Sequence, residues 1–371
     1  MDVINWVILA FALLGALDML IGNRFGLGKE FERGFYLFGD MALSMIGMLA
    51  LAPAIGIRLT PLFEGFYTTF GIDPSIIPAS LFANDMGGAS LALESARNEA
   101  VGVYNAFVVS SMMGCVISFT IPFALGVVDK SLHKEMFLGF LCGIVTIPVG
   151  CIAAGLMSGL TLIQILINLL PLIIISAVIS VGLILAPELC VRIFKVFGIL
   201  IKIVITAGLL LCIATAVSGV EIVKNLASLQ SAAMVCVDAC VILSGMFPLM
   251  FVVGKLLKKP MERLGTALGI NAVSALGFIP NLVTNTTTFG MMRDMDKRGV
   301  VLNAAFSVSA AFVFGCHMSF TMALSPDSTP AVIVGKLISG VSAVILALII
   351  CKKKYPKTST APASEVSQNC T

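Results

Sequence analysis

The sequence predicts an all-α polytopic membrane protein. Of its 371 residues, 58% are hydrophobic and only 12% are charged, about half the charged share of a soluble domain. Long apolar runs recur along the chain at lengths near the ~20 residues that cross a bilayer as a helix. The net charge of +3, with no basic face, disfavours nucleic-acid binding. The cysteines are scattered and most lie in apolar runs, so they indicate no disulfide scaffold or metal site.

Nine apolar runs are expected to cross the membrane. They are residues 3–22, 35–57, 101–127, 135–157, 161–186, 193–217, 231–256, 300–324 and 329–351. The first is interpreted as an uncleaved span, because no basic residue precedes it and no cleavage site follows. Two further apolar segments, 66–95 and 266–291, are interrupted by Pro, Gly and polar residues. We expect re-entrant or interrupted helices there, since broken backbone survives at membrane depth only inside protein or beside a wet cavity.

The basic residues predict the orientation of these spans. If the N-terminus lies outside, eighteen Lys and Arg residues fall on the cytoplasmic side. Only Arg58, Arg97, Lys224 and Lys336 fall outside, and Lys202 lies within a span. This bias follows the positive-inside rule and predicts a multi-pass protein with a cytoplasmic C-terminus. The polar tail, residues 352–371, is expected to be disordered.

Comparison of the chain with itself indicates an internal repeat. With a shift of 201 residues, Asn84 aligns with Asn285. The same shift aligns GCVISFT, which begins at Gly114, with GCHMSFT, which begins at Gly315. Apolar spans match one another by chance, so the weight of this alignment rests on its polar positions.

A shift of 198 aligns the preceding spans and brings Asp40 onto Asp238. Five crossings lie between these two aspartates, so the two copies have opposite orientations. We therefore expect a first repeat over 1–160, a connecting span over 161–190 and an inverted second repeat over 191–351. Inverted repeats with paired discontinuous helices are typical of secondary transporters, whose substrate site lies near the midplane where the repeats meet.

Polar residues in the spans and breaks are the candidates for a substrate site, because charge inside a membrane is costly and is usually functional. Broken helix ends add unpaired carbonyls and partial charges. The candidate substrate-binding residues are Asp40, Asn84, Asp85, Gly87, Gly88, Ser118, Thr120, Asp238, Asn281, Asn285, Thr286, His317, Ser319 and Thr321. The alternative is that the amides and hydroxyls satisfy only their own backbone or a neighbouring helix.

His317 has three readings on the sequence alone: it relays a proton, bonds a substrate hydroxyl or is a satisfied packing residue. Motifs for phosphate-binding loops, zinc proteases or Cys-x-x-Cys pairs are absent from the sequence. We expect no cofactor and no enzymatic activity. An intramembrane enzyme with Asp40 and Asp238 as a dyad is a weak alternative, and a sensor that binds without transporting is another.

Four segments carry a resemblance to a known family. They are LIGNRFGLGKEFERGF from Leu20, LFANDMGGASLAL from Leu81, SFTIPFALG from Ser118 and GMMRDMDKRGVVLNAAFSVSAAFVFGCHMSFT from Gly290. The chain resembles the ethanolamine permease family of bacterial ethanolamine-utilisation systems over roughly residues 1–350. The resemblance implies an inner-membrane permease that delivers ethanolamine to a cytoplasmic catabolic pathway.

One residue departs from the family pattern. An acidic residue commonly precedes the histidine, whereas this chain has Cys316. We therefore expect facilitated or secondary uptake of a small protonated amine, with ethanolamine as the first candidate. An ion-coupled transporter of another small amine or an amino acid is the alternative. The partners are the small-molecule substrate and the lipid bilayer, and the sequence leaves a homo-oligomer open.

Overall fold

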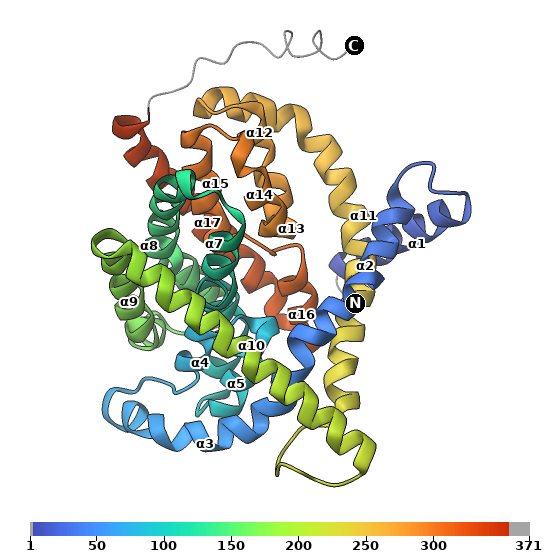
Figure 1. Ribbon diagram of the computed structural model, residues 1–371, viewed down its shortest axis with the longest axis vertical. Coiled ribbons are helices and arrows are strands. Elements are labelled where there is room, and N and C mark those ends of the chain that lie inside the picture. The colour runs from blue at the N-terminus through green and yellow to red at the C-terminus, as the bar shows by residue number, and fades with distance from the viewer. Residues whose placement is uncertain (1–2, 356–371) are drawn as a thin grey trace.

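The computed structural model describes residues 3–355 and confirms the all-helical class, with no strand in that range (Figure 1). The helices are α1 Val3–Leu20, α2 Leu27–Met41, α3 Gly47–Phe70, α4 Ile76–Leu81, α5 Gly88–Ser95, α6 Glu99–Tyr104, α7 Ile121–Val127, α8 His133–Met157, α9 Leu162–Leu185, α10 Pro187–Ser218, α11 Leu229–Leu268, α12 Ala272–Leu276, α13 Phe278–Val283, α14 Asn285–Met291, α15 Lys297–Ser309, α16 Cys316–Leu324 and α17 Thr329–Lys354. The predicted disordered tail lies mostly outside the described residues.

Eight helical stretches in the described range are long and apolar enough to cross a membrane. They are Val3–Leu20, Leu27–Arg58, Glu99–Val127, Lys130–Met157, Leu162–Leu185, Pro187–Ser218, Leu229–Leu268 and Pro326–Lys352. Each overlaps one of the nine expected spans. Short π-helical turns join α2 to α3 (Ala42–Ile46) and α6 to α7 (Asn105–Gly114 and Val116–Thr120) without ending the helix.

The remaining expected span, 300–324, is not one helix. It is divided into α15 and α16 by a non-helical segment over residues 310–315. Within this segment the Phe312 and Phe314 amides donate to the carbonyls of Asn281 and Leu282, at 3.2 and 2.8 Å. A neighbouring segment therefore supplies the partners that the broken helix lost, which removes the cost of interrupting it in an apolar environment.

The two interrupted segments are hairpins. The first contains α4, a 3₁₀ turn over Asn84–Met86 and α5, and the second contains α12, α13 and α14. In each hairpin a hydrogen bond joins the two ends, and in both hairpins the bonded residues are 25 positions apart in the chain. The Asn98 amide donates to Asp73 Oδ2 at 2.9 Å, and the Asn271 amide donates to Asp296 Oδ1 at 2.9 Å.

We refer to residues 73–98 as hairpin 1 and residues 271–296 as hairpin 2. Hairpin 1 starts later than expected, because residues 66–70 still belong to α3.

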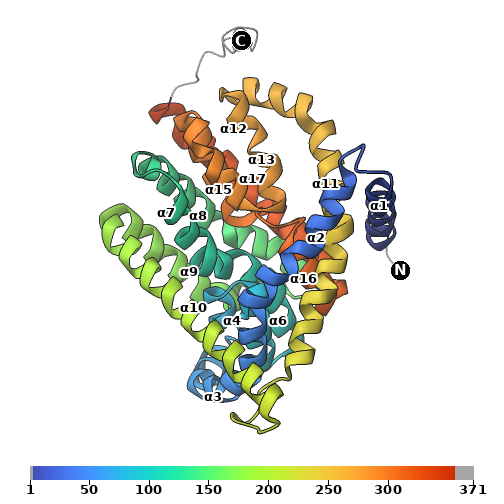
Figure 2. The ribbon, with the colours of Figure 1, turned by 45° about the vertical axis from the view of Figure 1, so that its right-hand side comes forward.

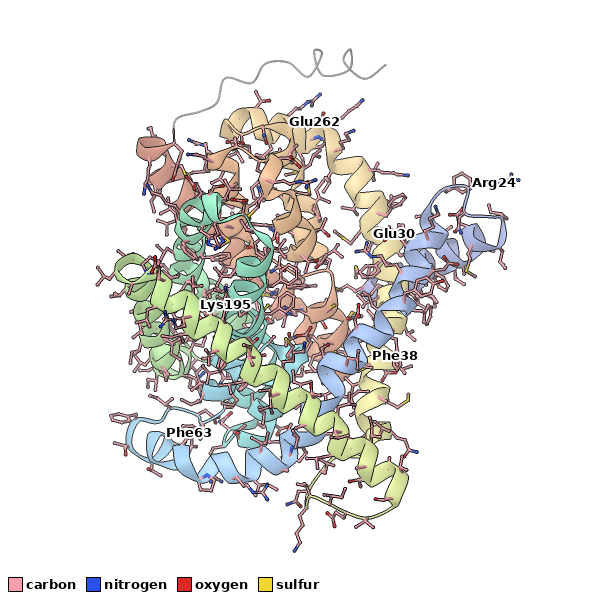
Figure 3. The ribbon with its side chains drawn as sticks, in the orientation of Figure 1. Arg24, Glu30, Phe38, Phe63, Lys195 and Glu262 are labelled. Carbon is pink, nitrogen blue, oxygen red and sulfur yellow. The ribbon has the colours of Figure 1, made fainter. Side chains whose placement is uncertain are left out.

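The two hairpins lie toward opposite ends of the long axis of the molecule (Figures 1 and 2). Glu262, near the start of hairpin 2, marks one end, and Phe63, near the start of hairpin 1, marks the other (Figure 3). Helices α1, α9 and α10 lie at the periphery and leave most of their apolar side chains exposed. Such faces are the surfaces that acyl chains cover in a membrane.

Candidate functional site

A cavity of about 380 Å³ lies between the two hairpins. Its lining comes from α2 and the π turn after it, the break of hairpin 1, the π-helical span after hairpin 1, the break of hairpin 2 and the start of α16. The lining residues are Leu37, Asp40, Met41, Ser44, Met45, Ala83, Asp85, Met86, Cys115, Phe119, Thr284, Thr286, Phe312, Cys316 and His317. We call this the central cavity. It brings together Asp40, Asp85, Thr286 and His317, which the sequence analysis had selected.

The lining of the central cavity contains pairs of residues related by the shift of 201. These are Ala83 with Thr284, Asp85 with Thr286, and Cys115 with Cys316. Both candidate repeats therefore contribute equivalent backbone positions to one cavity. The chemistry of the pairs is not symmetric, because the carboxylate of Asp85 in hairpin 1 corresponds to the hydroxyl of Thr286 in hairpin 2.

Asp85 is the acidic group of the central cavity that comes from a helix break. It lies in the 3₁₀ turn of hairpin 1, and its side chain is 18% exposed. Its Oδ1 is 3.8 Å from Nε2 of His317, too far for a direct hydrogen bond. Asp40 lines the same cavity from the exposed end of α2. The two carboxylates make the cavity suitable for a cation.

The amides of Asn84 and Asn285 are buried and cross from one candidate repeat to the other. Asn84 Nδ2, in hairpin 1, donates to the carbonyl of His317 at 3.4 Å. Asn285 Nδ2, in hairpin 2, donates to Thr120 Oγ1 at 3.2 Å. Each hairpin is thus anchored on the span that follows the other hairpin. The Oδ1 atoms of both residues are buried without a hydrogen-bond partner among the described residues.

Gly87 and Gly88 shape the break of hairpin 1 and do not line the cavity. Gly87 has φ +93°, and a Cβ there would collide with the Met48 side chain. A Cβ on Gly88 would collide with the carbonyl of Phe82. The glycines allow the chain to turn tightly enough to present Asp85 to the cavity.

Four of the selected hydroxyl groups lie outside the cavity lining and bond the backbone or a neighbouring segment, those of Ser118, Thr120, Ser319 and Thr321. Ser118 Oγ accepts from the Ala83 amide at 3.0 Å, which satisfies a donor freed by the helix break. Thr120 accepts from Asn285, and Ser319 and Thr321 donate to the carbonyls of Cys316 and His317. These are the local roles that the alternative interpretation gave them.

Two further selected residues also lie outside the central cavity. Asn281 is buried in α13, and its Nδ2 donates to the carbonyl of Asn303 at 3.3 Å. Asp238 is exposed on α11, although its neighbours Ala239 and Cys240 are buried. The structure therefore does not bring Asp40 and Asp238 into this cavity as a catalytic dyad.

Three residues in or beside the cavity that bear on its chemistry were not selected from the sequence. Lys336, counted there as an outside residue, is only 1% exposed in α17 and its Nζ is 3.2 Å from Nδ1 of His317. Its position several residues inside an apolar run was the signal that could have identified it. Phe119 and Phe312 form aromatic walls, with ring centroids 5.6 Å apart. No spacing pattern distinguishes these rings from ordinary packing residues.

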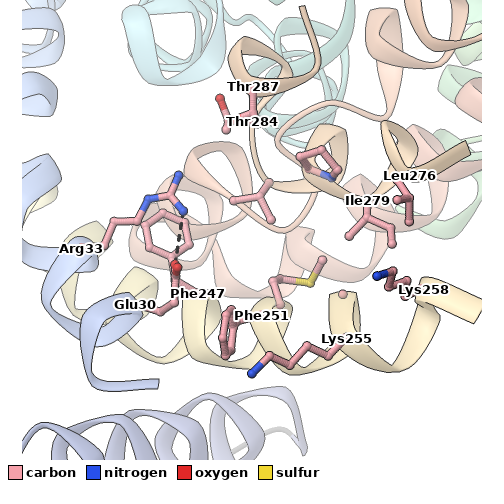
Figure 4. Close-up of a pocket in the computed structure, with 14 residues that line it drawn as sticks. Glu30, Arg33, Phe247, Phe251, Lys255, Lys258, Leu276, Ile279, Thr284 and Thr287 are labelled. Atoms are coloured by element: carbon pink, nitrogen blue, oxygen red, sulfur yellow. Dashed lines mark hydrogen bonds and ion pairs between the residues drawn. The ribbon is translucent and has the colours of Figure 1, made fainter. Parts of the chain in front are cut away.

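A second cavity of about 380 Å³ lies between α2, α11 and hairpin 2 (Figure 4). Arg33 bonds Glu30 at 3.2 Å and stacks 4.9 Å above the Phe247 ring. Lys255 lies 4.0 Å above the Phe251 ring. Thr284 lines both this cavity and the central cavity, so a single turn of hairpin 2 separates them.

Comparison with known proteins places the chain in a family. The family model described as "Ethanolamine utilisation protein, EutH" matches residues 1–350. The chain belongs to the EutH family. As a EutH-family member it is 39% identical over 368 residues to a probable ethanolamine permease EutH of Listeria monocytogenes, and the match covers 99% of each chain.

Two other relatives of this EutH-family chain are more distant. It is 34% identical to the probable ethanolamine permease EutH of Escherichia coli, covering 95% of this chain and 96% of that one. It is 36% identical to an uncharacterized Bacillus subtilis protein, YxeR, covering 92% of each. No solved structure matches the chain. The family and the eight apolar helices together indicate a multi-pass membrane transporter.

Proposed function

We propose that this protein takes up ethanolamine across the bacterial inner membrane by alternating access, with the central cavity as its substrate site. The observation that carries this proposal is the carboxylate of Asp85 in a cavity lined by both hairpin breaks. The names of the relatives supply the substrate, and the cavity supplies chemistry that suits it.

The cavity offers one group for each end of the substrate. The ammonium interacts with Asp85 and with the faces of Phe119 and Phe312, since cations bind aromatic faces as well as carboxylates. The hydroxyl bonds Thr286 and His317, which line the same cavity. Uptake of a cation into a cell that is negative inside is favourable by about 2.3 kcal/mol per 100 mV, so coupling to a second ion is not required.

The two hairpins act as the gates in this proposal. The inverted repeat over residues 1–160 and 191–351, joined by the span 161–190, places one hairpin toward each face of the membrane. The positions of the hairpins at opposite ends of the molecule support it (Figure 1). With the N-terminus outside, hairpin 2 is the cytoplasmic gate and the cavity of Figure 4 is the exit path.

Counterflow in liposomes tests the proposal directly. Purified protein in vesicles loaded with unlabelled ethanolamine is expected to accumulate labelled ethanolamine, and empty vesicles are the control. An excess of another small amine or of an amino acid is expected to compete poorly. Stronger competition by such a solute, or a requirement for a Na⁺ or H⁺ gradient, would favour the alternative of an ion-coupled transporter. Absence of any exchange with retained ethanolamine binding would identify a sensor.

Replacing Cys316 by Asp is expected to tighten the apparent affinity for ethanolamine. Cys316 is partly exposed in the cavity, next to His317. A new carboxylate there is expected to lower KM by about twofold to fivefold, since a partly solvated ion pair contributes up to about 1 kcal/mol. The uncharged Cys316→Asn variant is the matched control and should not lower KM. If KM rises equally in both variants, the ammonium does not bind on this side of the cavity.

A further inference from the structure

Lys336 is a buried cation beside the candidate site, and the proposed function gives it no role. It lies in α17 and is 1% exposed. Its Nζ donates to the carbonyl of Ser111 at 2.6 Å and lies 3.2 Å from Nδ1 of His317. A lysine buried this deeply loses the hydration of its ammonium, so its few partners must have a defined role.

If Lys336 is charged, the hydrogen bond between Lys336 and His317 can have only one direction. An ammonium group has donors and no acceptor, so Nδ1 of His317 must be the acceptor. A neutral imidazole with an accepting Nδ1 carries its proton on Nε2. Nε2 is the ring nitrogen that faces Asp85, 3.8 Å from its Oδ1. The ring is further held by Phe312, with centroids 4.9 Å apart.

We propose that Lys336 is a positioning residue that fixes the tautomer of His317, so that His317 stays neutral and presents an Nε2–H donor to the central cavity. This inference rests on the proposed function and deepens it. The Nε2–H donates to the hydroxyl oxygen of the substrate, while Asp85 takes the ammonium. His317 does not carry a proton across the membrane, because Lys336 occupies the nitrogen that would have to accept it.

The other ionisable groups around this pair are few. Asp85 faces the ring from hairpin 1, Cys316 precedes it on α16, and Asp40 and Cys115 line the same cavity. The Cys115 thiol is neutral near neutral pH, so the two carboxylates are the anions of the cavity. Lys336 is therefore the cation on the Nδ1 side of the ring, and Asp85 is the anion on the Nε2 side.

Transport at different pH values tests the proposal. In Lys336→Met the Nδ1 atom is free to bind a proton, and the resulting imidazolium competes with the substrate ammonium for Asp85. KM, divided by the wild-type KM at the same pH, should rise severalfold between pH 8 and pH 6, because more of the ring binds a proton as the pH falls. The double variant Lys336→Met/His317→Gln should show no such rise. Lys202→Met, on the exposed face of α10, is the matched control and should follow the wild type.

A spectrum separates this proposal from the proposed function. The chain has two histidines, so the ¹⁵N signals of His317 in labelled protein are assigned by comparison with His317→Gln. The wild type should show a neutral ring protonated at Nε2, and Lys336→Met should show a mixture of tautomers and imidazolium at pH 6. An Nδ1-protonated ring in the wild type would overturn the proposal, as would a Lys336→Met profile that follows the wild type. If the wild type does not transport ethanolamine, the proposed function is overturned. The ¹⁵N spectrum then still tests the tautomer of His317.

Discussion

Replacing Asp85 by Asn should reduce ethanolamine uptake by about tenfold to a hundredfold, since a hydrogen bond to a charged group contributes about 1.5–3 kcal/mol. The substitution keeps the shape of the side chain and removes the charge that faces the substrate ammonium. Asp85 lies in a short turn whose shape depends on Gly87 and Gly88, and its side chain is partly exposed to the cavity, so the fold should tolerate the amide. Initial rates of labelled ethanolamine uptake into proteoliposomes give the measurement.

Asp238→Asn is the matched control for this prediction. It makes the same chemical change at the position aligned with Asp40 in the second candidate repeat, but on an exposed face of α11. Uptake by this variant should remain within about twofold of the wild type, as expected for a surface substitution away from the site. Equal losses of uptake in the two variants would show that the central cavity is not the substrate site.

Replacing Gly87 by Ala should destabilise hairpin 1 and abolish most uptake. The residue has φ +93°, which costs an L-amino acid about 1–2 kcal/mol. Its new methyl group would also collide with the buried Met48 side chain, and such overpacking costs about 1–3 kcal/mol. Thermal unfolding in detergent should show a lower midpoint, and transport by the folded fraction should fall because Asp85 is displaced.

Gly71→Ala separates these two causes. Gly71 also has a left-handed backbone, at φ +68°, but no atom lies within 4 Å of the position that a Cβ would take. This variant should therefore lose only the conformational part of the stability and should retain uptake. If Gly87→Ala behaves in the same way, the packing against Met48 does not position the hairpin.

The sequence was sufficient for the parts of the site that depend on local chemistry. Apolar runs predicted nine spans, of which eight overlap helices of span length, and Pro, Gly and polar residues predicted both hairpins. Asp85 and Thr286 were selected as polar groups at expected helix breaks, and His317 was selected as a histidine inside an expected span. These signals depend on neighbouring residues in the chain, so they can be recognised without knowing how the helices pack.

Properties that depend on contacts between distant segments were not predictable. The span 300–324 is divided because the Phe312 and Phe314 amides find carbonyl partners on hairpin 2, more than thirty residues earlier along the chain. Lys336 was placed at a membrane surface because hydropathy treats a lysine near the start of a span as interfacial. Its partners, Ser111 and His317, come from other helices. Asp238 was selected by alignment alone, which does not determine the face of a helix on which a side chain lies.

The side-chain amides of Asn84 and Asn285 each donate a hydrogen bond to the other half of the chain, and this pairing has a mechanical consequence. A span that tilts carries with it the hairpin of the other half of the chain, since Asn84 bonds His317 and Asn285 bonds Thr120. Opening at one end of the cavity is then linked to movement at the other end. In the proposed alternating-access mechanism, such a link would keep the two ends from opening at the same time, so that no continuous water-filled pore forms.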